Sequence, residues 1–480
     1  MRDLYATSLR PVKEQYLEIV RIKTSGTWCS YSSFRSAPFA LFFIQPSDLA
    51  ILTGMTQSIF QVCMADRREP DEDRLGSRWA EAWSHPIAGN IRAVSDLLGQ
   101  MDKEQELRDD LLGLFSGVLD AMRMNRENRE KDAGAIFTLV ERWLDANAAS
   151  GSLDNRQKMA LCQAFIRAGL EPPDAIRITS SGTGSEVDMV GLGVPDIETL
   201  MGAMIPEDVT GYMVLREGIG AMPLGASALF VTQIIAQAVP KLVSLGRYFL
   251  LDPMADMRMA AAEGFVNLAQ AGAIDAGVLS DLIRLRKWLP DQATKTILDR
   301  AIKEALRRET TGGSIPDAWT VHRLVTSLPD GTGSQSIMAS VSRGSRKCIA
   351  TLLLKADHGI KDAYAIPCTS ASDQRRSLTE LEDAVPMHEV PKTYLSNALA
   401  TALGEGLVEG LPPAPGFLEV AEMLGLGDIA PVEHGAVSFL EIADPEAQLC
   451  GLSATKRGRL MARSLEWARD HEMSSSWFVT

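Results

Sequence analysis

Apolar residues recur every three or four positions through long parts of this 480-residue chain. This period constrains the fold most, because it places apolar side chains on one face of an α-helix. Similar rows run from Ile136 to Leu144 and from Met159 to Ile166, where Gly169 and two prolines follow as a stop signal. The sequence therefore predicts a mainly α-helical protein, and the clearest row consists of Leu107, Leu111, Leu114, Val118 and Met122.

An uncharged stretch extends from Gly218 to Pro240. Its length is close to the roughly 20 residues that a membrane-spanning helix needs. It contains Pro223, Gln233 and Gln237, however, and such residues are costly in lipid. The stretch therefore predicts a central helix of a globular protein, buried on all sides, and not a membrane span.

Two further helices are expected later in the same helical region. Asp275 can cap a helix that carries Val278, Leu282 and Leu285, and Asp291 can cap the next one. The connections between these helices are short, which favours antiparallel neighbours.

The period changes near residue 335. Ile337, Ala339 and Val341 alternate with other side chains, and Cys348 to Leu354 form a second apolar run after a connection that contains Gly344. Two extended runs around such a connection predict a β-hairpin, and residues 362–366 could add a third strand. We expect a small antiparallel β element near residues 335–367.

These patterns divide the chain into six parts. We expect an irregular N-terminal leader, a helical region, a loop-rich connection, a second helical region, a small β insertion with a loop, and a C-terminal helical region. The corresponding ranges are 1–45, 46–175, 176–224, 225–330, 331–389 and 390–480.

A short motif lies in the second helical region. The segment contains Asp252, Pro253, Asp256, Met257 and Arg258, followed by an alanine-rich run. This motif resembles the signature of a HEAT-type helical repeat, in which an Asp-Pro turn joins two helices and an Arg opens the second one. The match covers residues 237–269, about one repeat, and Met257 replaces the usual β-branched residue. The resemblance implies an α-solenoid, and an ordinary helical bundle remains the alternative.

Composition narrows the classes of partner. The chain has 48 basic and 62 acidic residues, a net charge of −14, which disfavours nucleic acid and anionic membranes. Its six cysteines form no CxxC pair, which favours free thiols in the cytoplasm. The sequence completes no phosphate-binding loop or metal motif, so we expect neither a cofactor nor a metal.

A small cluster of cations lies at the predicted hairpin connection. Arg343, Arg346 and Lys347 are candidate binding residues for an acidic partner. Protection of an exposed turn is the alternative role for the same charges.

Two functional hypotheses follow. The first is a non-enzymatic protein-interaction or scaffold role, because helical repeats present extended binding surfaces. The second is an enzyme with a site where the helices meet the β element, around Asp330, Asp357 and His358, with Lys355 nearby. The sequence favours the first hypothesis but identifies no catalytic residue.

Overall fold

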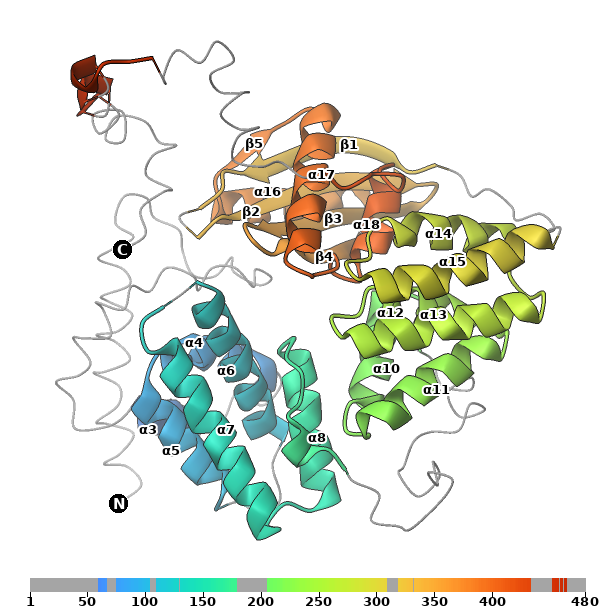
Figure 1. Cartoon of the computed structure of the whole chain (residues 1–480). Coiled ribbons are helices and arrows are strands. Elements are labelled where there is room, and N and C mark those ends of the chain that lie inside the picture. Colours follow the sequence, from blue (N-terminus) through green and yellow to red (C-terminus); the bar gives the residue numbers. More distant parts are fainter. Residues whose placement is uncertain are drawn as a thin grey trace. The chain divides into compact units, whose positions relative to one another are not determined.

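A computed structural model gives the fold of this chain (Figure 1). The fold is mainly α-helical with a small five-stranded antiparallel sheet, as the sequence predicts. The residues that the structure describes are 59–66, 75–103, 109–128, 130–178, 205–308, 318–330, 332–432, 451–456, 458–460 and 462–463. The predicted leader at residues 1–45 lies outside them.

The first helices pack around one apolar core. Four residues of the row predicted from periodicity, namely Leu111, Leu114, Val118 and Met122, are buried in α6, and the fifth, Leu107, lies outside the described residues. Asp154 begins α8 with a reciprocal cap, because its carboxylate accepts from the amide of Gln157 and its own amide donates to the Gln157 side chain. The helices are α3 (Ile59–Asp66), α4 (Leu75–Ala88), α5 (Ile91–Met101), α6 (Asp109–Glu127), α7 (Ala133–Ser150) and α8 (Asn155–Arg167).

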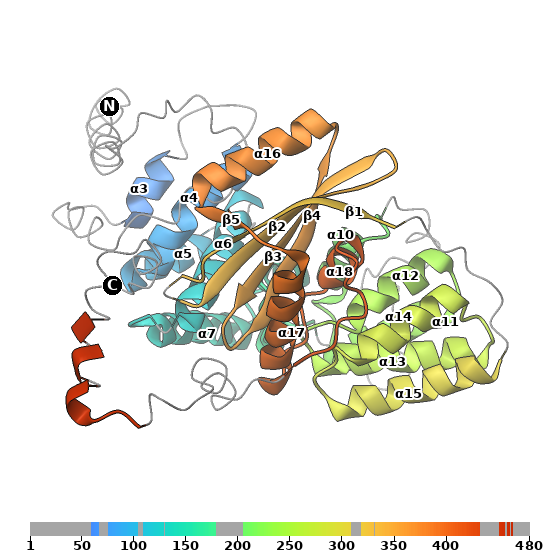
Figure 2. The same cartoon turned by 90° about the horizontal axis from the view of Figure 1, so that it is seen from above.

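The next six helices form antiparallel pairs that stack in two layers. Helices α11, α13 and α15 pack side by side in one layer, and α10, α12 and α14 make the other (Figures 1 and 2). Asp275 and Asp291 cap α14 and α15 as predicted. The bounds are α10 (Val209–Ile219), α11 (Leu224–Ala236), α12 (Pro240–Phe249), α13 (Ala255–Gln270), α14 (Ala276–Arg286) and α15 (Gln292–Arg307).

Helix α11 departs from the sequence prediction. It begins within the uncharged stretch, but it is not buried on all sides. Phe230 and Ile234 are buried, whereas Gly225 and Leu229 are exposed, and 52% of Leu229 is accessible. The prediction of all-round burial is wrong because α11 lies in one layer of a two-layer stack, so only one side faces the core.

The sheet extends beyond the range that periodicity indicates. The predicted hairpin is present, with Arg343 paired to Arg346 across its turn, and Gly344 adopts a positive φ of 58° there. The predicted third strand lies in β4, while β1 and β5 add to the other edge. The strands are β1 (Thr320–Ser327), β2 (Ser334–Arg343), β3 (Arg346–Lys355), β4 (Gly359–Cys368) and β5 (Met387–Glu389), in the order β4-β3-β2-β1-β5.

Helices cover both faces of this sheet. Ile337 and Val341 of β2 belong to the large core that also contains residues of α10 to α15 and Leu399 of α17. Met338, between them in sequence, packs on the opposite face with Leu378 of α16. Alternate residues of one strand thus belong to different cores. The helices are α16 (Ala371–Ala384), α17 (Lys392–Val408) and α18 (Phe417–Met423).

The C-terminal helical region expected at 390–480 is described only in part, because residues 433–450, 457, 461 and 464–480 lie outside the described residues. Within the described part of the chain, no helix has the length and apolar character needed to cross a membrane.

Close packing of α11 on α13 gives a stability prediction. A Cβ atom added at the buried Gly264 would lie 2.8 Å from Ile235 Cβ and 3.1 Å from the Thr232 carbonyl oxygen. We expect Gly264→Val to lower the free energy of unfolding by about 2 kcal/mol, because the core would be overpacked. Denaturant titration followed by circular dichroism would measure this change.

The matched control is Gly218→Val in α10, where an added Cβ meets no atom within 4 Å. We expect this variant to stay within about 0.5 kcal/mol of the parent protein. Equal effects of the two substitutions would contradict the close approach of α11 and α13.

Candidate interaction groove

The turn between α12 and α13 is held by a buried carboxylate. Asp252 is fully buried, and its Oδ2 accepts hydrogen bonds from the Tyr212 hydroxyl (2.9 Å) and from Arg216 Nε (2.8 Å). Its Oδ1 accepts from the Met254 amide at 2.8 Å. Burial, together with the nearby Asp252 carboxylate, raises the pKa of Tyr212 well above its usual value, so this hydroxyl stays a donor. Asp252 therefore connects α10 to the turn between α12 and α13.

Arg258 continues this set of contacts toward the next helix pair. The arginine is buried, and its Nη1 donates to the carbonyl oxygens of Asp252 and Pro253, at 2.8 Å each. Its Nε donates to Asp291 Oδ2 at 2.9 Å. Asp291 caps α15 and follows Asp252 by 39 residues. One guanidinium thus links the turn between α12 and α13 to the turn between α14 and α15.

Asp291 is held as a carboxylate by these contacts. Partial burial alone would raise its pKa. Hydrogen bonds from Thr294 and Arg258 outweigh that effect, and the pKa lies below its usual value. The cap and the ion pair both depend on the ionised form.

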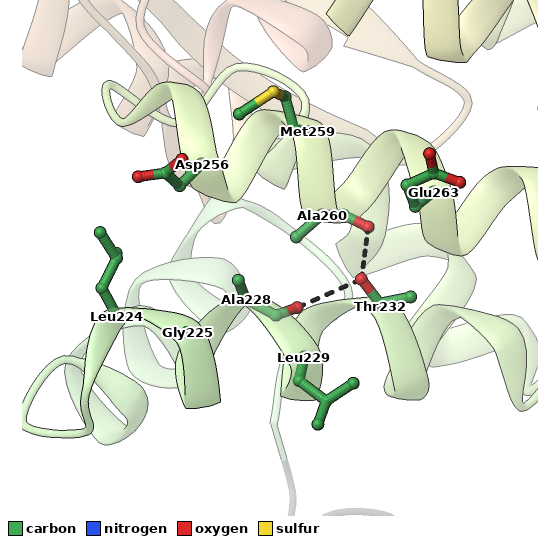
Figure 3. A pocket seen from close by; sticks show the side chains of 9 residues that line it. All are labelled: Leu224, Gly225, Ala228, Leu229, Thr232, Asp256, Met259, Ala260 and Glu263. Carbon is green, nitrogen blue, oxygen red and sulfur yellow. Dashed lines mark hydrogen bonds between the residues drawn. The ribbon is translucent and has the colours of Figure 1, made fainter.

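A groove lies between α11 and α13 at the surface of this stack (Figure 3). Its volume is about 420 Å³, and its lining is mostly apolar. Small residues on both helices let the helix backbones approach closely. The lining residues are Leu224, Gly225, Ala228, Leu229, Thr232, Asp256, Met259, Ala260 and Glu263.

The floor of the groove is closed by one hydroxyl. Thr232 Oγ1 lies 2.9 Å from the Ala260 carbonyl oxygen and 3.2 Å from that of Ala228, as Figure 3 shows. This satisfies the hydroxyl within the groove wall and leaves apolar groups facing the opening. The groove therefore offers apolar contact along its length, with Leu229 and Met259 accessible on opposite walls.

Two carboxylates flank the apolar floor. Asp256 and Glu263 lie seven residues apart on α13, which corresponds to about 10 Å along a helix. Glu263 pairs with Arg300 at 3.2 Å, and both side chains are exposed, so water weakens this ion pair. Asp256 has no hydrogen bond or ion pair with any other described residue. The arrangement suits an apolar segment that carries positive charge near its ends.

The cations predicted at the hairpin already have contacts within the chain. Arg343 pairs with Glu422 at 3.1 Å, and its guanidinium lies 4.7 Å from the Trp319 ring centre. Arg346 is exposed and lies 5.8 Å from the same ring. Lys347 Nζ donates to the Ser345 carbonyl oxygen at 3.3 Å. The turn brings all three together, but their binding role stays a prediction.

The residues of the enzyme hypothesis lie near one another without forming a site. Asp330 Oδ1 accepts from the amides of Thr332 and Ser334, so it closes its own turn. Asp357 is exposed, and His358 Nδ1 lies 3.2 Å from the Ala356 carbonyl oxygen. Lys355 is buried, and desolvation lowers its pKa. Among the described residues, no group of three His, Cys, Asp or Glu side chains could hold a metal ion.

Sequence reasoning missed the groove because its residues are spread over two helices. Leu224, Ala228 and Leu229 belong to the uncharged stretch that predicted all-round burial. In the sequence, Asp256 stands out only as part of the HEAT-like motif. The sequence signal for the groove is Glu263, which places a second carboxylate on the same helix face two turns after Asp256.

Comparison with known proteins gives partial matches. Residues 57–173 match the family model described as the N-terminal domain of the uncharacterised protein y4lR, and residues 223–309 match the Y4lR second domain. The chain is similar to the uncharacterized protein y4lR of Sinorhizobium fredii (strain NBRC 101917 / NGR234), with 26% identity over 408 residues. This alignment covers 83% of this chain and 78% of that protein.

These matches agree with the helical parts of the structure. The first range contains α3 to α8, and the second contains α11 to α15, including both walls of the groove. Neither matching model is a HEAT-repeat model. No solved structure matches the chain significantly.

The contact between Arg258 and Asp291 gives a pH prediction. Asn is as good a helix cap as Asp, so Asp291→Asn removes the charge while keeping the cap. We expect this substitution to lower the free energy of unfolding by about 1–2 kcal/mol at pH 7, because a buried arginine loses its charged partner. Urea unfolding of both proteins over a pH series would measure this difference.

The sign of the pH effect follows from the lowered pKa of Asp291. Its stabilisation is fully present above the unfolded-state pKa of about 3.9 and is lost as the pH falls through the folded-state value. The difference between parent and Asp291→Asn should be constant above about pH 5 and should shrink below pH 4. A difference that grows on acidification would contradict the assigned ion pair.

Proposed function

We propose that this chain is a non-enzymatic interaction protein, in which α10 to α15 form a HEAT-like repeat and the groove between α11 and α13 binds a protein partner. The groove is the observation that carries the proposal. It combines the exposed Leu229 with Met259 on the facing wall, over a floor of small residues. Accessible apolar residues gathered in a groove are typical of a protein-binding site.

The repeat assignment rests on stacking and on the contacts of the turns. Three helix pairs follow one another, and Arg258 joins the turn at Asp252 to the one at Asp291. Such stacking produces a continuous surface that is well suited to binding an extended partner. The sheet shares a core with this stack, so it would hold the repeat in a fixed shape.

The enzyme alternative gains no support from the geometry. Asp330 uses its carboxylate within a turn, and His358 lies against a main-chain oxygen. A general base needs a position within hydrogen-bond reach of a substrate, and both side chains are already engaged by the main chain of their own turns. The interaction role therefore takes precedence.

Composition and cysteine chemistry support the proposed setting. The net charge of −14 favours a protein partner over nucleic acid. Four cysteines in the described part of the chain form no disulfide, namely Cys63, Cys162, Cys348 and Cys368, which is consistent with the reducing cytoplasm.

The hairpin cations are proposed as a second, separate contact. Arg346 is the most accessible of the three, beside the ring of Trp319. An acidic segment of a partner could bind Arg346 and Lys347 while Arg343 keeps its pair with Glu422.

Site-specific photocrosslinking tests the groove as a binding site. A photoreactive phenylalanine analogue replaces Leu229 in the groove or, as a control of similar exposure, Ile91 on α5. We expect a discrete adduct with another protein from position 229 in living cells, and none from position 91. The captured protein is then identified, purified and titrated against this chain.

A second substitution makes this test specific. Met259→Gln keeps the length of the side chain but weakens apolar contact, so affinity for the purified partner should fall about fivefold. Met124→Gln on the half-buried face of α6 is the matched control and should leave affinity unchanged. Equal adducts from both crosslinking positions, or no effect of Met259→Gln, would refute binding in the groove.

A further inference from the structure

A basic segment near the C-terminus contains exposed helical residues. The described residues at 454–456, 458–460 and 462–463 are helical, and all of them are exposed. Lys456, Leu460 and Arg463 follow the spacing i, i+4, i+7, which places three side chains on one face of a continuous helix. The face therefore presents an apolar side chain between two cations.

The wall of the groove on α13 carries the complementary pattern. Asp256 and Glu263 have the same seven-residue separation, and Met259 and Ala260 lie between them. When two helices lie side by side, residues with equal spacing on each helix can face one another, whether the helices are parallel or antiparallel. Each cation could then reach a carboxylate, Arg463 in exchange for the contact that it has in the structure, while Leu460 contacts the apolar floor. This agreement does not depend on orientation.

We propose that residues 453–463 bind in the groove between α11 and α13 of the same chain. The inference rests on the proposed function, because it assigns an occupant to the groove that would bind the partner. The segment would occupy the groove when no partner is bound, and a partner of similar chemistry would have to displace it.

The tether favours the chain's own segment over that of a second copy. The described body ends at Val432, whose amide donates to the Ala400 carbonyl oxygen at 2.9 Å. Just before this point, Trp288 Nε1 at the end of α14 donates to the Ile429 carbonyl oxygen at 3.0 Å. The chain thus leaves the body beside the repeat helices themselves.

The length of the tether is sufficient. Twenty residues separate Val432 from Ser453, and they can span up to about 65 Å. Neighbouring helices in a stack lie about 10 Å apart, so α11 and α13 are within reach of a chain that leaves beside α14. A tether of this length gives an effective concentration on the order of millimolar, far above that of a second copy.

The segment gains stability from such binding. A helix of about ten residues is marginal in water by itself, so its amide protons should exchange rapidly unless it is packed. In the groove, Leu460 would lose exposed apolar surface, and two exposed ion pairs would form. These pairs would weaken as salt is raised, because exposed charges are screened.

Hydrogen exchange on the full-length chain tests this proposal. Amide exchange over residues 454–463 is compared in the parent, in D256K/E263K, in K456E/R463E and in the variant with all four changes. We expect either double variant to exchange about tenfold faster than the parent and the fourfold variant to regain protection. Recovery in the fourfold variant depends on charge pairing and not on either side chain alone.

Two controls keep the experiment decisive. The variant E141K/D145K reverses two exposed charges on α7 and should leave exchange at 454–463 unchanged. Thermal unfolding checks that each variant is folded, and D256N/E263Q replaces D256K/E263K if the latter is not. In that milder variant we expect a smaller gain in exchange rate, in the same direction.

The outcomes separate this inference from the proposed function. Equal exchange over 454–463 in all forms overturns the docking of this segment, even if position 229 still crosslinks a partner. Protection that rises with protein concentration, together with dimers in sedimentation, assigns the groove to a second copy and overturns the own-chain proposal. The third outcome is that amide protection at 454–463 behaves as expected, but the photoreactive residue at position 229 captures no partner in K456E/R463E. In that case the docking of the segment is supported and the partner-binding role of the groove is refuted.

Discussion

The carboxylate of Asp252 is the contact on which the stacking of helices α10 to α15 depends. It is fully buried, and it receives hydrogen bonds from Tyr212 and Arg216 of the preceding helix pair. The main chain at the same turn accepts from Arg258, which also reaches Asp291 at the turn between α14 and α15. A buried charge is tolerated only with such partners, so a shift of one helix pair would leave charges unpaired. The network therefore fixes the position of each pair relative to the next.

The groove is a consequence of this fixed stacking. Gly264 on α13 lets the helix pass close to Ile235 of α11, and Thr232 bonds across to Ala260. Close approach at one end of the pair and larger side chains farther along leave a furrow between Leu229 and Met259. Asp256 lies at the first turn of α13, where the helix dipole favours a negative charge. The same helix start thus supplies both the scaffold contact of Arg258 and the charge at the groove.

Much of the fold follows from interactions between residues that are close together in the chain, and the sequence shows these directly. The apolar row of α6, the caps at Asp275 and Asp291, and the hairpin around Gly344 are each set by residues close together in the chain. Strand β1 was harder to anticipate, because Thr320 to Ser327 gains its order from pairing with β2 and β5. The candidate groove could not be predicted as a site, because its two walls lie about 30 residues apart in sequence.

The amino-acid sequence by itself determined the apolar row of α6, the caps of α14 and α15, the hairpin of β2 and β3, and which turn carries the Asp-Pro motif. These features depend on periodicity, capping and turn chemistry, and all of these act over a few residues. Only the tertiary structure decided that α11 keeps one side exposed and that Arg258 reaches Asp291. Exposure depends on which neighbours cover a helix, and an ion pair depends on two turns meeting in space. Neither can be derived from local pattern alone. The same uncharged sequence is compatible with a helix that is buried on all sides and with a helix that keeps one side exposed.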